Sequence, residues 1–157
     1  MSEPSAAAPG SSLQARALRW LSQREHSRLE LRGKLLHATG EHTAAEVDAL
    51  LDELAARGHL SDERFVESRV HVRHDRFGNR RIEQELRRHG LAPDAEMQQQ
   101  LRASEPARAL EVWRKKFGRA AADAAGRARQ ARFLAARGFS PEVVHRIVAG
   151  PHDDESC

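Results

Sequence analysis

Apolar residues recur along this chain with the spacing of amphipathic helices, and no segment alternates in the way a half-buried strand does. The clearest stripe is Val47, Leu50, Leu51 and Leu54, an i, i+3, i+4, i+7 set that shares one helix face. Similar stripes follow one another to Val148, separated by short polar breaks. The pattern therefore predicts an all-α protein.

The helical pattern is repeated about three times. In each copy a Leu precedes a Gly by four residues, at Leu36–Gly40, Leu86–Gly90 and Leu134–Gly138, and the leucines lie 50 and 48 residues apart. Such a period is typical of helical units that share one continuous core. We expect nine helices in three tandem three-helix repeats that form an elongated, curved array. The expected divisions are a disordered tail at 1–12, repeats at 13–60, 61–104 and 105–150, and an acidic tail at 151–157.

Local signals predict where the helices begin and end. Ser27–Glu30 and Thr43–Glu46 have the form of capping boxes. The other expected starts are Ser61, Asn79, Pro93, the segment after Ser104–Pro106, and Ser140–Pro141; the expected stops are Gly40, Gly58, Gly90 and Gly138. Phe65, Val66 and Val70, with Val72 as a further candidate, are expected to form one buried face. Trp20 and Trp113 are expected in the core.

Composition narrows the class of protein. The chain is 39% hydrophobic and 31% charged, which suits thin helical layers better than one thick core. No run of about 18 apolar residues is present, so no membrane span is expected. Cys157 is the only cysteine, so an internal disulfide is excluded. We expect a cytoplasmic protein that is a monomer.

Charge is distributed unevenly over the repeats. The first carries 7 basic and 7 acidic side chains, the second 9 and 8, and the third 10 and 4. Arginine supplies most of the positive charge, and its planar fork fits phosphate and carboxylate groups. This surplus favours an anionic partner, although a solvated basic face would also keep the chain soluble.

The basic residues fall into three clusters, which are the candidate partner- or phosphate-binding residues. The first is Arg73, Arg76, Arg80, Arg81, Arg87 and Arg88; the second is Arg114, Lys115, Lys116 and Arg119; the third is Arg127, Arg129 and Arg132. On one face of the array they would form a groove for phosphate. Aromatic residues are few, so base stacking is poorly provided for, and DNA contact should be salt-sensitive and independent of sequence.

No catalytic arrangement is found. Gly33–Lys34 resembles the end of a phosphate-binding loop, but Arg28 replaces the leading glycine and the segment is predicted to be helical. His71 and His74 have a spacing that can bind metal, yet nine histidines in a helical chain produce such pairs by chance. We therefore expect no enzyme activity, no metal and no cofactor.

The second repeat resembles the RecX family, the bacterial regulators of the RecA recombinase. The matching residues are Leu60–Val66, Arg69, Arg73, Gly78–Leu86 and Gly90, with further similarity at Ala17–Leu21 and Ser27–Leu35. The chain departs from the family pattern at His89, where Arg or Lys is usual, and at Val70, which replaces an aromatic residue. The third repeat matches less closely.

The resemblance implies a non-enzymatic modulator of recombination and of the SOS response. RecX-like proteins bind the groove of the RecA–single-stranded DNA filament. They inhibit its ATP hydrolysis, strand exchange and co-protease activity, in part by blocking filament growth or by promoting disassembly. Under this hypothesis, the partner of this chain is the RecA filament, and the arginine clusters contact its acidic groups or DNA phosphate.

Two other functions remain open from the sequence. A non-specific nucleic-acid-binding module would affect a recombinase only by competing for DNA, so its effect should weaken as free DNA is added. A helix-turn-helix transcription factor would need one base-reading helix. The three similar repeats argue against that reading.

Overall fold

The computed structural model describes residues 9–38 and 42–150, with side chains from residue 13 onward. The regular structure in these residues consists of eight α-helices, with no strand. This confirms the prediction of an all-α protein. The expected acidic tail, the stop signal at Gly40 and most of the expected N-terminal tail lie outside the described residues.

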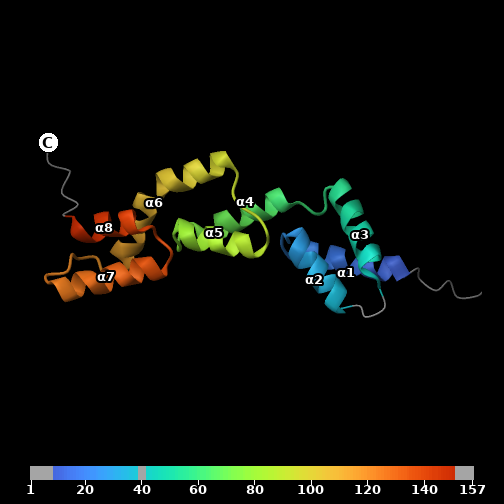
Figure 1. Ribbon diagram of the computed structural model, residues 1–157, viewed down its shortest axis with the longest axis horizontal. Coiled ribbons are helices and arrows are strands. Elements are labelled where there is room, and N and C mark those ends of the chain that lie inside the picture. Colours follow the sequence, from blue (N-terminus) through green and yellow to red (C-terminus); the bar gives the residue numbers. More distant parts are fainter. Residues whose placement is uncertain (1–8, 39–41, 151–157) are drawn as a thin grey trace, which may run out of the picture. The chain divides into compact units, whose positions relative to one another are not determined.

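The helices are α1 (Pro9–Gln23), α2 (Arg28–Ala38), α3 (Ala44–Ala56), α4 (Asp62–Arg73), α5 (Asn79–Arg88), α6 (Ala95–Lys116), α7 (Ala124–Ala136) and α8 (Pro141–Ala149) (Figure 1). Contacts divide the chain into two compact units, Met1–Ser68 and Arg69–Cys157. Helix α1 begins at Pro9, inside the segment 1–12 that the sequence assigns to a tail. No described helix is both long enough and apolar enough to cross a membrane.

The first unit has a core formed by α1, α2 and α3. The predicted stripe of Val47, Leu50, Leu51 and Leu54 is buried, which confirms the assignment of that face. The other core residues are Leu13, Ala17, Leu31, Leu35 and Leu60. Gly33 lies inside α2, as predicted, so the Gly33–Lys34 pair does not form a phosphate-binding loop.

Three predicted helix starts in this part of the chain are confirmed. The hydroxyl groups of Ser27, Thr43 and Ser61 each accept a hydrogen bond from the backbone N–H three residues later, at 3.1 to 3.2 Å. The Glu30 carboxylate also binds Arg24, and the Glu46 carboxylate binds His42.

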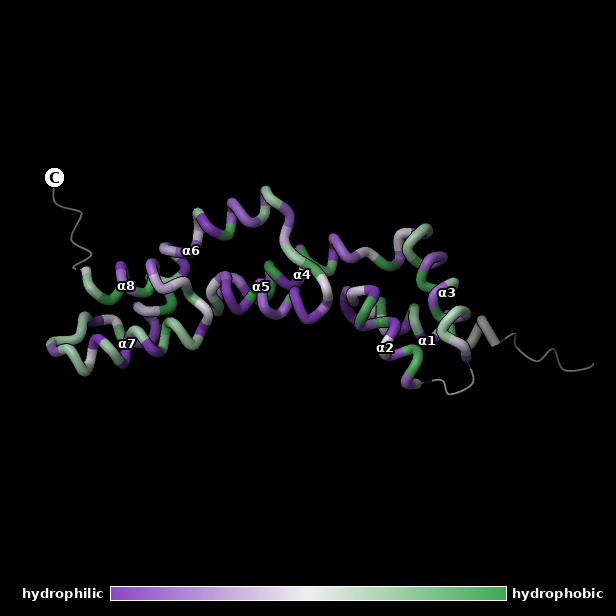
Figure 2. Tube along the Cα trace, in the orientation of Figure 1, coloured by the Kyte–Doolittle hydropathy of each residue, from purple (hydrophilic) through white to green (hydrophobic). Residues whose placement is uncertain are grey.

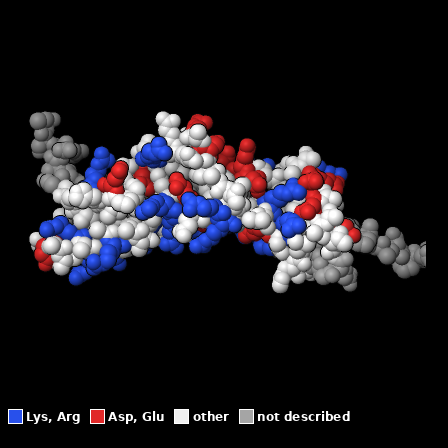
Figure 3. Space-filling view, in the orientation of Figure 1, with Lys and Arg blue, Asp and Glu red and all other residues white. Residues whose placement is uncertain are grey.

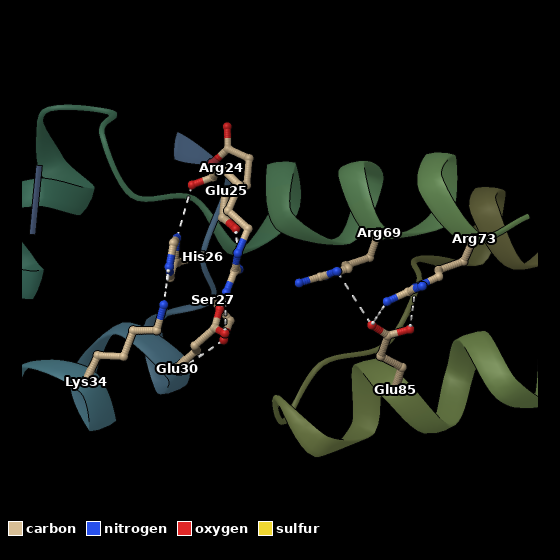
Figure 4. A network of polar contacts seen from close by, with 9 residues as sticks. All are labelled: Arg24, Glu25, His26, Ser27, Glu30, Lys34, Arg69, Arg73 and Glu85. Carbon is tan, nitrogen blue, oxygen red and sulfur yellow. Dashed lines mark hydrogen bonds and ion pairs between the residues drawn. The ribbon is translucent and has the colours of Figure 1, made fainter. Parts of the chain in front are cut away.

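Helix α2 is anchored at its start by a buried histidine (Figure 4). Only 1% of His26 is exposed; its Nδ1–H donates to the carbonyl of Arg24 at 3.0 Å, and its Nε2 accepts from the Lys34 ammonium at 2.8 Å. This pair of bonds requires a neutral ring. Burial lowers the pKa of His26 and outweighs the hydrogen bond to the Arg24 carbonyl, which raises it. The nearby charges of Arg24 and Lys34 lower the pKa further, and Glu30 opposes them slightly.

We expect the first unit to lose stability as the pH falls below about 6.5, the ordinary pKa of histidine. Because the folded-state pKa lies below the unfolded value, the neutral ring stabilises the fold fully above that pH, and this contribution is lost as the pH falls through the folded-state pKa. Urea unfolding followed by the NMR signals of α2 should show a lower midpoint at about pH 5. His26→Asn should flatten this dependence, whereas His59→Gln, at an exposed site, should leave it unchanged. An equal slope in all three proteins would contradict the prediction.

The second unit has a core formed by α6, α7 and α8. Its buried residues are Ala109, Trp113, Leu134, Phe139, Val144, Ile147 and Val148. The core assignment of Trp113 is confirmed, and its indole N–H donates to the buried Gln130 amide oxygen at 3.0 Å. Trp20 is only partly buried and packs against the core of the first unit.

The prediction of nine helices is wrong for the described residues, because two expected helices are one. Helix α6 runs for 22 residues without a break and contains Pro106 in its interior. A proline there costs about 3 kcal/mol and usually ends a helix. Here tertiary contacts hold the helix across it: Glu105 bonds to two loops, and Arg108 donates to the Leu101 carbonyl one turn before the proline. The expected division between 104 and 105 therefore falls inside α6.

Other local predictions also need correction. Asn79 is not the cap of α5: Gly78 holds that position, and the Asn79 N–H donates to Glu105 instead. Asp94, one residue after Pro93, caps α6 by accepting from the Met97 N–H at 2.8 Å. Val72 is 57% exposed, so it does not belong to the buried face of α4. Ser140 and Pro141 begin α8 as predicted.

Two loops of the second unit meet at a pair of glycines, which we call the glycine clasp (Gly78 and Gly138). The Gly78 N–H donates to the Arg137 carbonyl at 2.8 Å, and the Arg80 N–H donates to the Gly138 carbonyl at 3.0 Å. A Cβ at Gly78 would overlap the backbone of Gly138 and Phe139, so only glycine allows this approach. The clasp fixes the start of α5 beside the end of α7.

Candidate phosphate-binding surface

Helix α5 carries the first basic cluster. It buries Ile82 and Leu86, which are one turn apart, and exposes Arg80, Arg81, Arg87 and Arg88. Most of α5 is hydrophilic in Figure 2, and basic side chains gather over it in Figure 3. Arg73 ends α4, and Arg76 is exposed in the connection that follows. The sequence pattern thus produces a helix with a narrow apolar face and a broad basic one.

Four of these six arginines line one cleft of about 490 Å³ in the second unit. Its walls are formed by Arg73, Arg80, Arg81, Gln84, Glu85, Arg88, Ala135, Ala136 and Gly138. The far wall comes from the end of α7, which the glycine clasp places beside α5. Arg76 and Arg87 do not line the cleft, so the structure divides the predicted cluster into two groups.

Glu85 is the only carboxylate among the residues that line the cleft. It accepts from the Arg73 guanidinium at 3.1 and 3.4 Å, and a nitrogen of Arg69 lies 3.7 Å from it (Figure 4). Two guanidinium groups therefore share one carboxylate. Arg73, although predicted as a binding residue, is already partly neutralised within the protein.

Phe77 forms the centre of a second grouping of arginines. The Arg81 guanidinium lies 4.2 Å from the ring centroid, and those of Arg137 and Arg73 lie at 5.6 and 5.8 Å. Such cation–π contacts hold long side chains in fixed positions. Arg137 is not one of the residues predicted from the sequence. It immediately precedes Gly138, just as Arg57 immediately precedes Gly58 at an earlier helix end, and this repeated Arg–Gly pair was a signal that could have revealed it.

The second and third clusters lie on α6, on α7 and in the connection between them, and both helices contribute to the second-unit core. Their members are Arg114, Lys115 and Lys116 in the last turn of α6, Arg119 in the following connection, and Arg127, Arg129 and Arg132 on α7. All seven are exposed. The Lys116 ammonium lies 5.5 Å from the Phe133 ring centroid, and the Arg119 carbonyl accepts a hydrogen bond from Gln130. Two residues of the second cluster therefore contact α7, the helix that carries the third cluster.

A partly buried polar node around Arg108 and Glu105 was missed by sequence reasoning. The Arg108 guanidinium donates to the carbonyls of His74, Phe77 and Leu101, and to the side chains of Asn79 and Ser104. Burial lowers the pKa of Arg108, and the charges of Glu105 and Asp75 oppose that shift.

Glu105, only 3% exposed, forms the acidic side of the node. It accepts from the backbone N–H groups of Asn79 and Ser140 and from the Ser140 hydroxyl. The node thus joins the loop before α5, helix α6 and the loop before α8. Glu105 lies on the same helical face as Leu101 and Ala109, and a charged residue in an apolar stripe was the signal that could have revealed the node.

Within residues 9–38 and 42–150, no group of three His, Cys, Asp or Glu side chains could hold a metal ion. The rings of His71 and His74 lie 5.8 Å apart between centroids, and His74 Nε2 is 3.1 Å from an oxygen of Asp75. The functional groups that this surface offers are mainly arginine guanidinium groups, which suit the binding of phosphate or carboxylate groups.

Comparison with known proteins identifies relatives along most of the chain. Residues 61–95 match the family model described as RecX, second three-helix domain, and residues 104–148 match RecX, third three-helix domain. The chain is 55% identical to regulatory protein RecX of Ralstonia nicotianae over 141 residues, which cover 88% of this chain and 87% of the relative. It is 53% identical to regulatory protein RecX of Ralstonia pickettii with the same two coverages.

Solved structures support the same fold. The crystal structure of RecX from Lactobacillus salivarius aligns with a TM-score of 0.69, covering 89% of this chain and 94% of that one. The sequence identity in this alignment is 17%, so it bears on the fold alone. Together with the matched three-helix domains, it confirms the prediction of a helical repeat protein.

Proposed function

The chain belongs to the RecX family, and from this premise we propose that it binds the RecA–single-stranded DNA filament and inhibits its ATP hydrolysis, strand exchange and co-protease activity. In this role the protein is a cytoplasmic, monomeric, non-enzymatic regulator of recombination and of the SOS response, which acts without a cofactor. The relatives at about half identity are named regulatory proteins, which supports the regulatory role itself.

The exposed arginines of α5 are the observation that carries the proposal. A RecA–DNA filament offers acidic side chains and a phosphate backbone, and the arginines offer rigid cationic forks to either. Contact with DNA phosphate would make the interaction sensitive to salt, because binding releases condensed counterions. The seven basic residues of α6, α7 and their connection are the next candidates for contact.

The direct test measures RecA ATP hydrolysis on saturating single-stranded DNA while this protein is titrated. We expect strong inhibition well below one molecule per RecA, because a filament regulator that blocks growth or triggers disassembly acts on many protomers at once. Arg80→Glu with Arg88→Glu should abolish inhibition without unfolding the chain, since both side chains are exposed. Arg19→Glu with Arg57→Glu changes the charge equally in the first unit and should inhibit like wild type. Absence of inhibition by the wild-type protein would refute the proposal.

A second function, competition for DNA by a non-specific nucleic-acid-binding module, is favoured by the same arginine-rich surface. The two functions differ in their response to DNA. Inhibition by competition should weaken as free single-stranded DNA is added, whereas inhibition through the filament should persist.

A further inference from the structure

The cleft beside α5 has a surplus of positive charge. Four arginines and one glutamate line it, and the glutamate is already bound by Arg73 and Arg69. For Arg80, Arg81 and Arg88, no ion pair with a carboxylate is found anywhere in the described part of the chain. An anion that enters the cleft would therefore meet three guanidinium groups that no internal carboxylate neutralises.

The arginines are spread along the helix axis and not gathered at one point. Arg81 and Arg88 are seven residues apart, two helical turns, which corresponds to about 10.5 Å along α5. Since a single phosphate group is too small to bridge that span, the row suits a chain of phosphates better than an isolated one.

The other residues of the cleft favour the backbone of such a chain over its bases. Ala135, Ala136 and Gly138 allow close approach, and no lining residue offers an aromatic or large apolar surface on which a base could stack. The basic row also continues along α7, where Arg132 and Arg129 precede Ala136 by four and seven residues and so share its helical face. Arg127 lies off that face.

We propose that this cleft binds the phosphodiester backbone of single-stranded DNA, with Arg80, Arg81 and Arg88 on one side and the end of α7 on the other. The choice of a single strand rests on the proposed function, and the recognition of a phosphate chain rests on the cleft itself. Arg76 and Arg87 belong to the same sequence cluster but lie outside this site.

Binding of a labelled oligothymidylate to the full-length chain tests the α5 wall. Arg80→Gln with Arg88→Gln should weaken binding at least tenfold, and should reduce the slope of log K against log salt by roughly 1.4, which is about 0.7 for each lost single-strand phosphate contact. Arg76→Gln with Arg87→Gln removes the same charge outside the cleft and should change the affinity less than twofold. All four side chains are exposed, so the fold should tolerate both pairs. Equal loss in both double variants, or no loss in either, would overturn the proposal.

A second pair of variants tests the α7 wall independently. Ala136→Glu places a carboxylate in the cleft and should weaken binding about fivefold or more, while Ala124→Glu, exposed on the same helix outside the cleft and off the face of Ala136, should change it less than twofold. Equal effects of the two would show that only overall charge matters and would overturn the site. The proposal would also be overturned if inorganic pyrophosphate displaced the oligothymidylate at a lower concentration than unlabelled oligothymidylate does. It would likewise be overturned if the cleft variants lost binding to double-stranded DNA but not to the single strand.

The outcome separates this inference from the proposed function. If the cleft variants lose DNA binding while the wild-type chain fails to inhibit RecA, the site stands and the filament hypothesis falls. If the wild-type chain inhibits RecA while the cleft variants bind DNA normally, the filament hypothesis stands and the site falls.

Discussion

Replacement of Gly78 by Ala is expected to lower the free energy of unfolding of the second unit by about 3 kcal/mol or more. The added Cβ would overlap the backbone of Gly138 and Phe139, so the two loops of the glycine clasp must separate. Overpacking of this kind costs about 1–3 kcal/mol, and the two backbone hydrogen bonds of the clasp add about 1 kcal/mol each. Urea unfolding followed by Trp113 fluorescence reports on this unit.

Gly90→Ala serves as the matched control for that variant. Gly90 has a positive φ of 70°, but a Cβ there meets nothing within 4 Å. The Gly90→Ala variant should therefore lose only about 1–2 kcal/mol of unfolding free energy, through backbone strain. If Gly78→Ala, which carries no such strain, proves no more harmful than Gly90→Ala, the close approach of the two loops does not contribute to stability as we describe.

Replacement of Arg108 by Met should cost about 3–5 kcal/mol of unfolding free energy. Methionine matches the length of the stem but leaves the carbonyls of His74 and Phe77 without the donor they have now, while the Leu101 carbonyl keeps the Ser104 hydroxyl. Each buried acceptor that loses its partner costs about 1–3 kcal/mol. Buried Glu105 would also lose the electrostatic attraction of the Arg108 guanidinium.

Arg102→Met tests whether loss of any arginine from α6 has this effect. Arg102 is exposed on the same helix, so its replacement should change stability by less than about 0.5 kcal/mol. The same urea titration measures both variants. A cost below about 1 kcal/mol for Arg108→Met would mean that water takes over the role of the guanidinium and that the node is not essential.

Local sequence signals predicted the helix starts and buried faces correctly where the interactions involved are between residues close in the chain. The capping hydroxyl groups of Ser27 and Thr43 act within their own turn, and the stripe from Val47 to Leu54 follows from helical spacing alone. The prediction that a helix ends near Pro106 was wrong because the contacts that stabilise α6 around this proline come from residues far away in the chain, including Asn79 and Ser140.

The candidate site shows the same division between local and distant information. The sequence identified all four arginines of the cleft, because α5 needs only two buried positions and leaves the rest of its surface polar. It could not separate Arg88 from Arg87, since that distinction depends on where α7 lies. Arg108 escaped notice because three of its partners are backbone carbonyls, which any residue can provide and which the sequence therefore does not reveal.

The unbroken course of α6 has a consequence for how such a protein can evolve. The two matched three-helix domains end at residue 95 and begin at residue 104, so the border between them falls within the first turns of one continuous helix. A gene rearrangement that duplicated or deleted a repeat at this border would cut the helix and strip Glu105 or Arg108 of its bonds. The second and third repeats are therefore expected to be inherited together as one unit, whatever happens to the first.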